Sequence, residues 1–177
     1  MQIADKSHDT KGMVALAGIC AVLQLALSPN FAIGNGHPNF ALVFCACIAL
    51  SRGGAQGVVA GFVAGLFFDL SSTGPIGLMA LLLTIAAYVL GSEQRNRMAG
   101  DFAASVAIFS VSSLAVSVAY SIAMLLVGSA NSIIDAVIFR SVPTTFLSIV
   151  AFIPFAYFFS RVKASSLSGG HFSRRGI

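Results

Sequence analysis

Four glycines and an aspartate recur at every fourth position of one apolar stretch, and this ladder constrains the fold more than any other feature. The residues are Gly53, Gly57, Gly61, Gly65 and Asp69, within the segment GGAQGVVAGFVAGLFFDL. On an α-helix, positions four apart lie along one face. In water such glycines would cost the helix about 1 kcal/mol each, whereas in a bilayer they let another helix approach to backbone contact. The ladder therefore predicts a membrane helix that is packed closely on one side, with an acid at a defined depth.

The composition places the whole chain in a membrane. Of its 177 residues, 57% are apolar and 9% are charged, which is more apolar surface than a soluble domain of this length can bury. Its cysteines, Cys20, Cys45 and Cys47, have neither a disulfide framework nor metal-ligand spacing, so no metal or cofactor is expected. The net charge of +4 is dispersed near segment ends and does not indicate nucleic-acid binding. The prediction is an all-α polytopic membrane protein with a single membrane domain, residues 1–177.

Six apolar segments can be drawn, and we expect them to form a compact bundle of six transmembrane helices. The second and the fourth, of 13 and 16 residues, are short for a span, which needs about 20 residues. Such a segment can thin the bilayer, be shielded by neighbouring helices, or extend into its flanks. In the competing topology, segments two and three form one re-entrant hairpin. The segments cover residues 12–27, 38–50, 53–70, 75–90, 102–127 and 132–159.

The distribution of basic residues favours six spans. If the N-terminus is cytoplasmic, nine of the ten Lys and Arg residues lie in cytoplasmic tails and loops, and the outer loops hold none. The tenth is Arg140, within the sixth segment. This asymmetry follows the positive-inside rule. We therefore expect both termini in the cytoplasm, with an N-terminal tail over residues 1–11, the bundle over 12–160 and a flexible tail over 161–177.

Local punctuation predicts where two of the helices begin. Pro75 would be the first residue of the fourth helix, after a Ser/Thr/Gly cap. Ser132 and Asp135 would form a capping pair for the sixth. The sequence contains no nucleophile–base motif, phosphate loop or metal motif, so we expect no catalytic turnover.

Polar residues in the last two segments are candidates for a site. Segment five carries four serines at helical spacing, Ser110, Ser113, Ser117 and Ser121. They indicate either a close helix contact with hydroxyl hydrogen bonds or the wall of a polar ligand cavity. Arg140 and Thr144 mark a candidate intramembrane polar site in segment six. Arg140 either extends to the outer interface or faces the bundle interior, where it needs a partner such as Asp69. Unpaired, Asp69 is expected to be a solvated helix-end residue.

The stretch PNFALVFCACIALSRGGAQGVVAGFVAGLFFDLSSTGPIGLMALLLTIAAYVLG, residues 38–91, resembles the family of the rod shape-determining protein MreD. A proline-started short helix, a basic turn, a G-x-x-x-G-x-x-x-D helix and a glycine-opened fourth helix carry the resemblance. Its most specific residues are Gly57, Gly61, Gly65, Asp69 and Gly77. The chain length and the number of spans are also similar to that family.

The resemblance implies a non-enzymatic membrane subunit of the bacterial elongasome, which couples cytoplasmic MreB filaments to peptidoglycan synthesis. The implied location is the bacterial cytoplasmic membrane. The implied partners are a bitopic MreC-like protein and other elongasome membrane proteins, with self-association left open. The family fold is likened to the substrate-binding subunits of energy-coupling-factor vitamin transporters, so such a subunit is the alternative function.

Gly61 and Gly65 are expected at a helix–helix contact, which is either internal or made with a partner's span.

Overall fold

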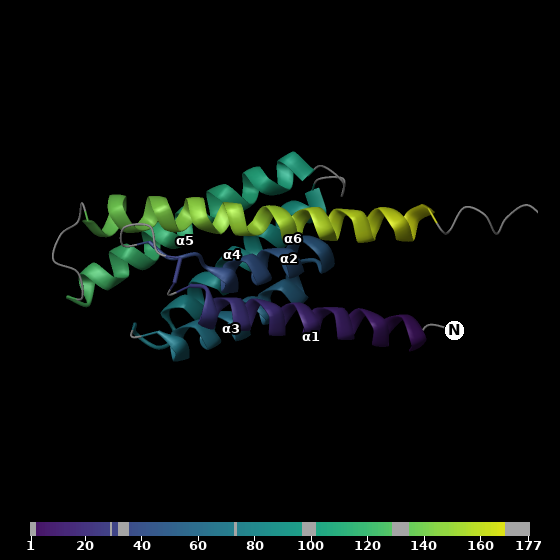
Figure 1. The fold of residues 1–177 in the computed structure, drawn as a ribbon, viewed down its shortest axis with the longest axis horizontal. Coiled ribbons are helices and arrows are strands. Elements are labelled where there is room, and N and C mark those ends of the chain that lie inside the picture. Colours follow the sequence, from purple (N-terminus) through teal and green to yellow (C-terminus); the bar gives the residue numbers. More distant parts are fainter. Residues whose placement is uncertain are drawn as a thin grey trace, which may run out of the picture.

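The computed structural model describes residues 3–28, 30–31, 36–72, 74–96, 102–128 and 135–168. The described residues form helices and no strand, which confirms the predicted all-helical fold for this part of the chain. The elements are α1 (Ile3–Ala26), α2 (Phe40–Arg52), α3 (Gly54–Ser71), α4 (Leu78–Asn96), α5 (Phe102–Leu126), the π-helix η1 (Asp135–Ser141) and α6 (Val142–Ser168). Figure 1 shows the start of α1 and the end of α6 at the same end of the bundle.

Several helix boundaries differ from those drawn on the sequence, and three of the differences are informative. α1 begins at Ile3 and α6 continues to Ser168, so both helices extend into segments expected to be tails. α4 begins at Leu78 instead of Pro75. The reason is the backbone of Gly77, whose φ of 97° lies in the left-handed region. A right-handed helix cannot include that conformation, which glycine adopts without strain.

α2 is the central helix of the bundle. Every residue from Phe40 to Ala49 is buried, and α2 contacts α1, α3, α4, α5 and α6. A helix that is apolar all round needs neighbours on all sides. These neighbours shield the 13 residues of α2, which is one of the three ways in which a short segment was expected to be accommodated.

Two helical stretches are long and apolar enough to cross a bilayer by themselves, Ala103–Leu126 and Ile138–Tyr157. Four further apolar stretches are shorter, Gly12–Ala26, Phe40–Arg52, Ala55–Ser71 and Leu78–Ser92. Large apolar side chains face outward from several helices, including Leu70 of α3 and Val111 of α5, which are 68% and 71% exposed. An outer surface of this kind suits a lipid environment better than water.

α5 and α6 pack through stacked aromatic rings and through η1. The rings of Phe109 and Phe152 lie 4.0 Å apart between centroids, with an interplanar angle of 10°. η1 leads directly into α6, and it ends two residues before Pro143. Pro143 has no N–H for the carbonyl four residues earlier, and the wider π turn lies directly upstream of that missing bond. The predicted cap residue Ser132 lies outside the described residues.

Candidate functional site

The glycine ladder lies against two helices of the same chain. A Cβ added to Gly57 would lie 2.7 Å from the Cα of Ala49 in α2. A Cβ added to Gly61 would lie 2.7 Å from the carbonyl oxygen of Leu83 in α4. Real Cβ atoms do not approach other atoms so closely, and only glycine leaves room for these backbone contacts. This part of the ladder is therefore occupied by α2 and α4.

Gly65 makes the tightest approach of the ladder. A Cβ on Gly65 would overlap the Cα of Ala80, and it would lie 2.7 Å from both the nitrogen of Ala80 and the carbonyl oxygen of Met79. Both residues belong to the first turn of α4. The missing side chain at Gly65 thus brings the end of α3 against the start of α4.

Gly53 and Gly77 belong to turns and not to a packed helix face. Gly53 is the single residue between α2 and α3, and its φ is 91°. Gly77 directly precedes α4, and no atom lies within 4 Å of a Cβ added there. Their left-handed backbone, which disfavours any side chain, accounts for both glycines. Gly53 was predicted to be the first glycine on the packed helix face, but it lies just outside α3, which begins at Gly54.

Asp69 is buried, with 1% of its surface exposed, so the expectation of a solvated helix-end residue is wrong. Its Oδ2 accepts hydrogen bonds from the N–H groups of Gly77 at 2.9 Å and Ala80 at 3.1 Å. Its Oδ1 accepts a third from the N–H of Met79 at 3.1 Å. N–H groups at a helix start lack partners within the helix, and negative charge is favourable there. Asp69 of α3 therefore caps α4, a role that we had predicted for the Ser/Thr/Gly segment before Pro75.

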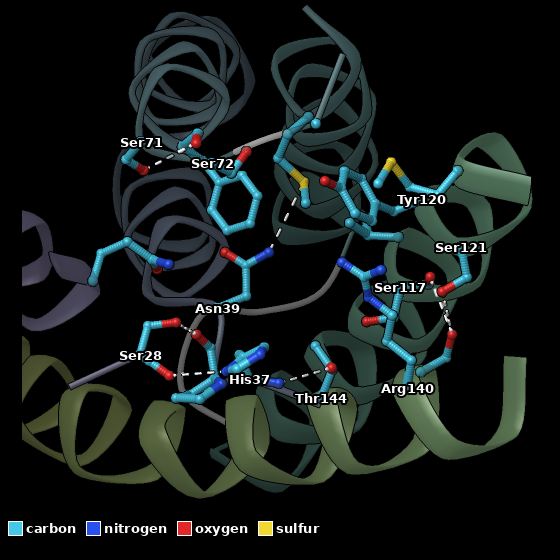
Figure 2. Close-up of a pocket in the computed structure, with 18 of the residues that line it drawn as sticks. Ser28, His37, Asn39, Ser71, Ser72, Ser117, Tyr120, Ser121, Arg140 and Thr144 are labelled. Atoms are coloured by element: carbon cyan, nitrogen blue, oxygen red, sulfur yellow. Dashed lines mark hydrogen bonds between the residues drawn. The ribbon is translucent and has the colours of Figure 1, made fainter. Parts of the chain in front are cut away.

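The structure places Arg140 over Tyr120 instead of beside Asp69. The guanidinium carbon of Arg140 lies 5.4 Å from the centroid of the Tyr120 ring, which is a cation–π contact. Figure 2 shows the Arg140 side chain extending into a cavity, with Tyr120 on one side. Of the two predicted orientations of Arg140, the structure has the one that faces the bundle interior.

This cavity has a volume of about 480 Å³, which is within the usual range for small-molecule pockets. The helix ends that form it lie opposite the start of α1 and the end of α6. Apolar residues from α1, α3, α4 and α5 complete the wall. The polar residues that line it are Gln24, Ser28, His37, Asn39, Ser71, Ser72, Ser117, Tyr120, Ser121, Arg140, Ser141 and Thr144.

Hydroxyl groups join α5 to η1 along one side of the cavity. The Oγ atoms of Ser121 and Ser141 lie 2.9 Å apart, and the hydroxyl of Ser141 donates to the carbonyl of Ser117 at 3.2 Å. Of the two interpretations of the α5 serines, a helix contact and a cavity wall, Ser117 and Ser121 satisfy both. Thr144 accepts a hydrogen bond from the N–H of His37 at 3.3 Å, so the chain before α2 is attached to α6.

Two cavity residues, Gln24 and Asn39, were not identified as site residues from the sequence. The Oε1 of Gln24 accepts a hydrogen bond from the N–H of Phe40 at 2.9 Å. The Oδ1 of Asn39 accepts one from the N–H of Leu42 at 3.0 Å. Asn39 directly before an apolar run is a recognised helix-start signal that would have found it. Gln24 has no such signal, because its partner is 16 residues away in the chain.

The family model of the rod shape-determining protein MreD matches residues 11–162. The chain belongs to the MreD family. The match covers the apolar parts of all six α-helices, and it confirms the resemblance seen in the sequence. As an MreD family member with these apolar helices, the chain is a membrane protein of the rod-shape system. No curated protein and no solved structure matches the chain, so nothing in the comparisons supports the transporter-subunit alternative.

Proposed function

We propose that this MreD family member is a non-enzymatic scaffold subunit of the bacterial elongasome. It would bind an MreC-like bitopic protein in the cytoplasmic membrane and so maintain cell shape during peptidoglycan elongation. The observation that carries the proposal is the family match over residues 11–162. The cap formed by Asp69 adds support, because three backbone N–H groups already engage this carboxylate. Its role is therefore structural.

The proposal includes six spans with both termini in the cytoplasm. Two observations support it: the positive-inside pattern of the basic residues, and the common end of the bundle at which α1 begins and α6 ends (Figure 1). The cavity would then face the outer side of the membrane. Because Gly57, Gly61 and Gly65 contact the chain's own helices, a partner's span would bind another face of the bundle.

We expect single cysteines at Asn30 and Asn131 to react with a membrane-impermeant maleimide added to intact cells. Cysteines at Gln56 and Arg97 should react only after the membrane is permeabilised. The unmodified chain is the matched control, since Cys20, Cys45 and Cys47 are buried. Labelling at Arg97 from outside would refute the topology. Protection of Gln56 even in permeabilised cells would favour the re-entrant hairpin of α2 and α3.

Depletion of the chain in its native host should convert rods into rounded cells, and the full-length chain expressed in trans should restore them. Affinity purification of the tagged chain should recover an MreC-like bitopic protein. An unrelated six-span protein of similar size, carrying the same tag, provides the control for membrane co-extraction. Normal rods after depletion, or equal recovery of the bitopic protein with the control, would contradict the proposal.

A further inference from the structure

Two buried amide side chains at the cavity, Gln24 and Asn39, have their oxygens engaged by the protein. The carboxamide oxygens of Gln24 and Asn39 are both taken by backbone N–H groups at the start of α2. These bonds fix which end of each amide is the oxygen, so the NH₂ groups are left for other partners. Both side chains are more than nine-tenths buried, with 8% and 5% of their surfaces exposed.

The acceptors available to these NH₂ groups are poor. Within the described part of the chain, the amide nitrogen of Asn39 donates only to the thioether sulfur of Met79, at 3.9 Å, and sulfur is a weak acceptor. Among the same residues, none accepts a hydrogen bond from the amide nitrogen of Gln24. Polar groups in side chains buried to this degree usually have partners, and a ligand in the cavity would supply a stronger acceptor to these NH₂ groups.

Arg140 adds a positive charge to this cavity. Its guanidinium carbon lies 5.4 Å from the centroid of the Tyr120 ring, and a guanidinium group carries five N–H donors. No acidic residue is among the described residues that line the cavity. The nearby carboxylate of Asp69 is held by the start of α4. A cation in such a setting favours an anionic partner.

We propose that the cavity binds an anionic phosphate group, with Arg140 as its charge partner and the amide NH₂ groups of Gln24 and Asn39 as hydrogen-bond donors. Arginine suits phosphate because its planar donors form paired, charge-assisted hydrogen bonds. The volume of about 480 Å³ leaves room for more than the phosphate itself. Apolar wall residues such as Leu25 and Val116 suit the carbon atoms attached to it. This binding site goes beyond the scaffold function.

The phosphate can come from the headgroup of an anionic lipid or from a soluble compound, and purified protein distinguishes the two. The full-length chain is purified in a maltoside detergent, which contains no phosphate. Its thermal unfolding is followed with added inorganic phosphate, with phosphatidylglycerol, and with phosphatidylcholine as the zwitterionic lipid control. Sodium chloride of equal ionic strength controls for salt. Because a ligand that binds the folded state raises the melting temperature, we expect a saturable increase with phosphatidylglycerol or inorganic phosphate.

Two variants test the assigned residues. Arg140→Gln removes the charge, and Gln24→Glu keeps an oxygen for the N–H of Phe40 while replacing the NH₂ donor with an anionic oxygen. Each should weaken the apparent affinity by about tenfold to a hundredfold, as expected for a charged hydrogen bond. Arg52→Gln, which removes an equal charge at the other end of α2, should leave the affinity unchanged. Native mass spectrometry provides an independent count of bound lipid.

An increase with phosphatidylglycerol alone would support a lipid headgroup as ligand, and one with inorganic phosphate would support a soluble source. The proposal is wrong if neither compound shifts the unfolding of the wild-type chain. It is also wrong if the shift persists in both cavity variants, or if Arg52→Gln abolishes it equally. Should Arg140→Gln not fold, Gln24→Glu and the wild-type titration still decide.

Discussion

Asp69→Asn should strongly destabilise the protein, although it replaces one polar group by another of nearly the same shape. Three N–H groups at the start of α4 donate to this carboxylate. Asparagine keeps one acceptor oxygen and turns an NH₂ group toward the remaining donors. Leaving a buried donor unsatisfied costs about 1–3 kcal/mol, and the favourable charge at the helix start is lost as well. We expect a loss of about 2–4 kcal/mol.

Thermal unfolding in detergent and the abundance of folded protein in membranes measure this effect. Asp69→Ala, which leaves all three donors without an acceptor, should be at least as destabilising as Asp69→Asn. Glu93→Gln is the matched control, because it removes the same charge and lies at the other end of α4. If both Asp69 variants unfolded at the wild-type temperature, Asp69 would not cap α4.

Gly65→Ala should destabilise the protein, even though alanine favours helices by about 1 kcal/mol over glycine. The added Cβ would overlap the Cα of Ala80 and would lie 2.7 Å from the carbonyl oxygen of Met79. Backbone atoms cannot move aside as a flexible side chain can, so α3 and α4 would have to separate. Overpacking of this kind costs about 1–3 kcal/mol, and Gly65→Leu should cost more.

Gly18 provides a control with the opposite expected sign. It lies in α1, and no atom is within 4 Å of a Cβ added there. Gly18→Ala should therefore be neutral or slightly stabilising, and Gly18→Leu should be tolerated in folding. The comparison is made by melting temperature and by elution as a single folded species. Equal tolerance of leucine at Gly65 and Gly18 would mean that α3 and α4 do not pack as described.

The effects of substitutions at Asp69 and at Gly65 on the free energy of unfolding are expected to be non-additive. The close approach at Gly65 brings the first turn of α4 to α3, and that approach places the N–H groups of Met79 and Ala80 at the Asp69 carboxylate. Residues that share a contact show non-additive effects. The spacing of four residues between Gly65 and Asp69 already placed both on one face of α3. It did not show that this face packs against the start of α4.

The candidate site was predictable in part. Arg140 and Thr144 stand out because polar residues are rare in apolar segments, and both line the cavity. Of the four serines of α5, Ser117 and Ser121 line the cavity and bond to η1, whereas the hydroxyl of Ser110 donates to the carbonyl of Val106 in its own helix. Gln24 and Tyr120 were not identified, because Gln24 bonds a residue far away in the sequence and Tyr120 acts through a ring contact that no local pattern encodes. Asn39 was missed although its place directly before an apolar run is a local helix-start signal.

The all-helical class, the membrane environment and the close packing of Gly57, Gly61 and Gly65 could be predicted from the amino-acid sequence. These follow from composition, apolar segment length and four-residue spacing, which are local properties of the chain. The three-dimensional packing was needed to show which helices the glycines meet, that Asp69 caps α4, and that Arg140 contacts Tyr120 at a polar cavity. A single polar side chain on an apolar helix has many potential partners. Its actual partner is fixed by how the helices pack, because burial in the bundle leaves each polar group only the donors and acceptors that the packing brings within reach.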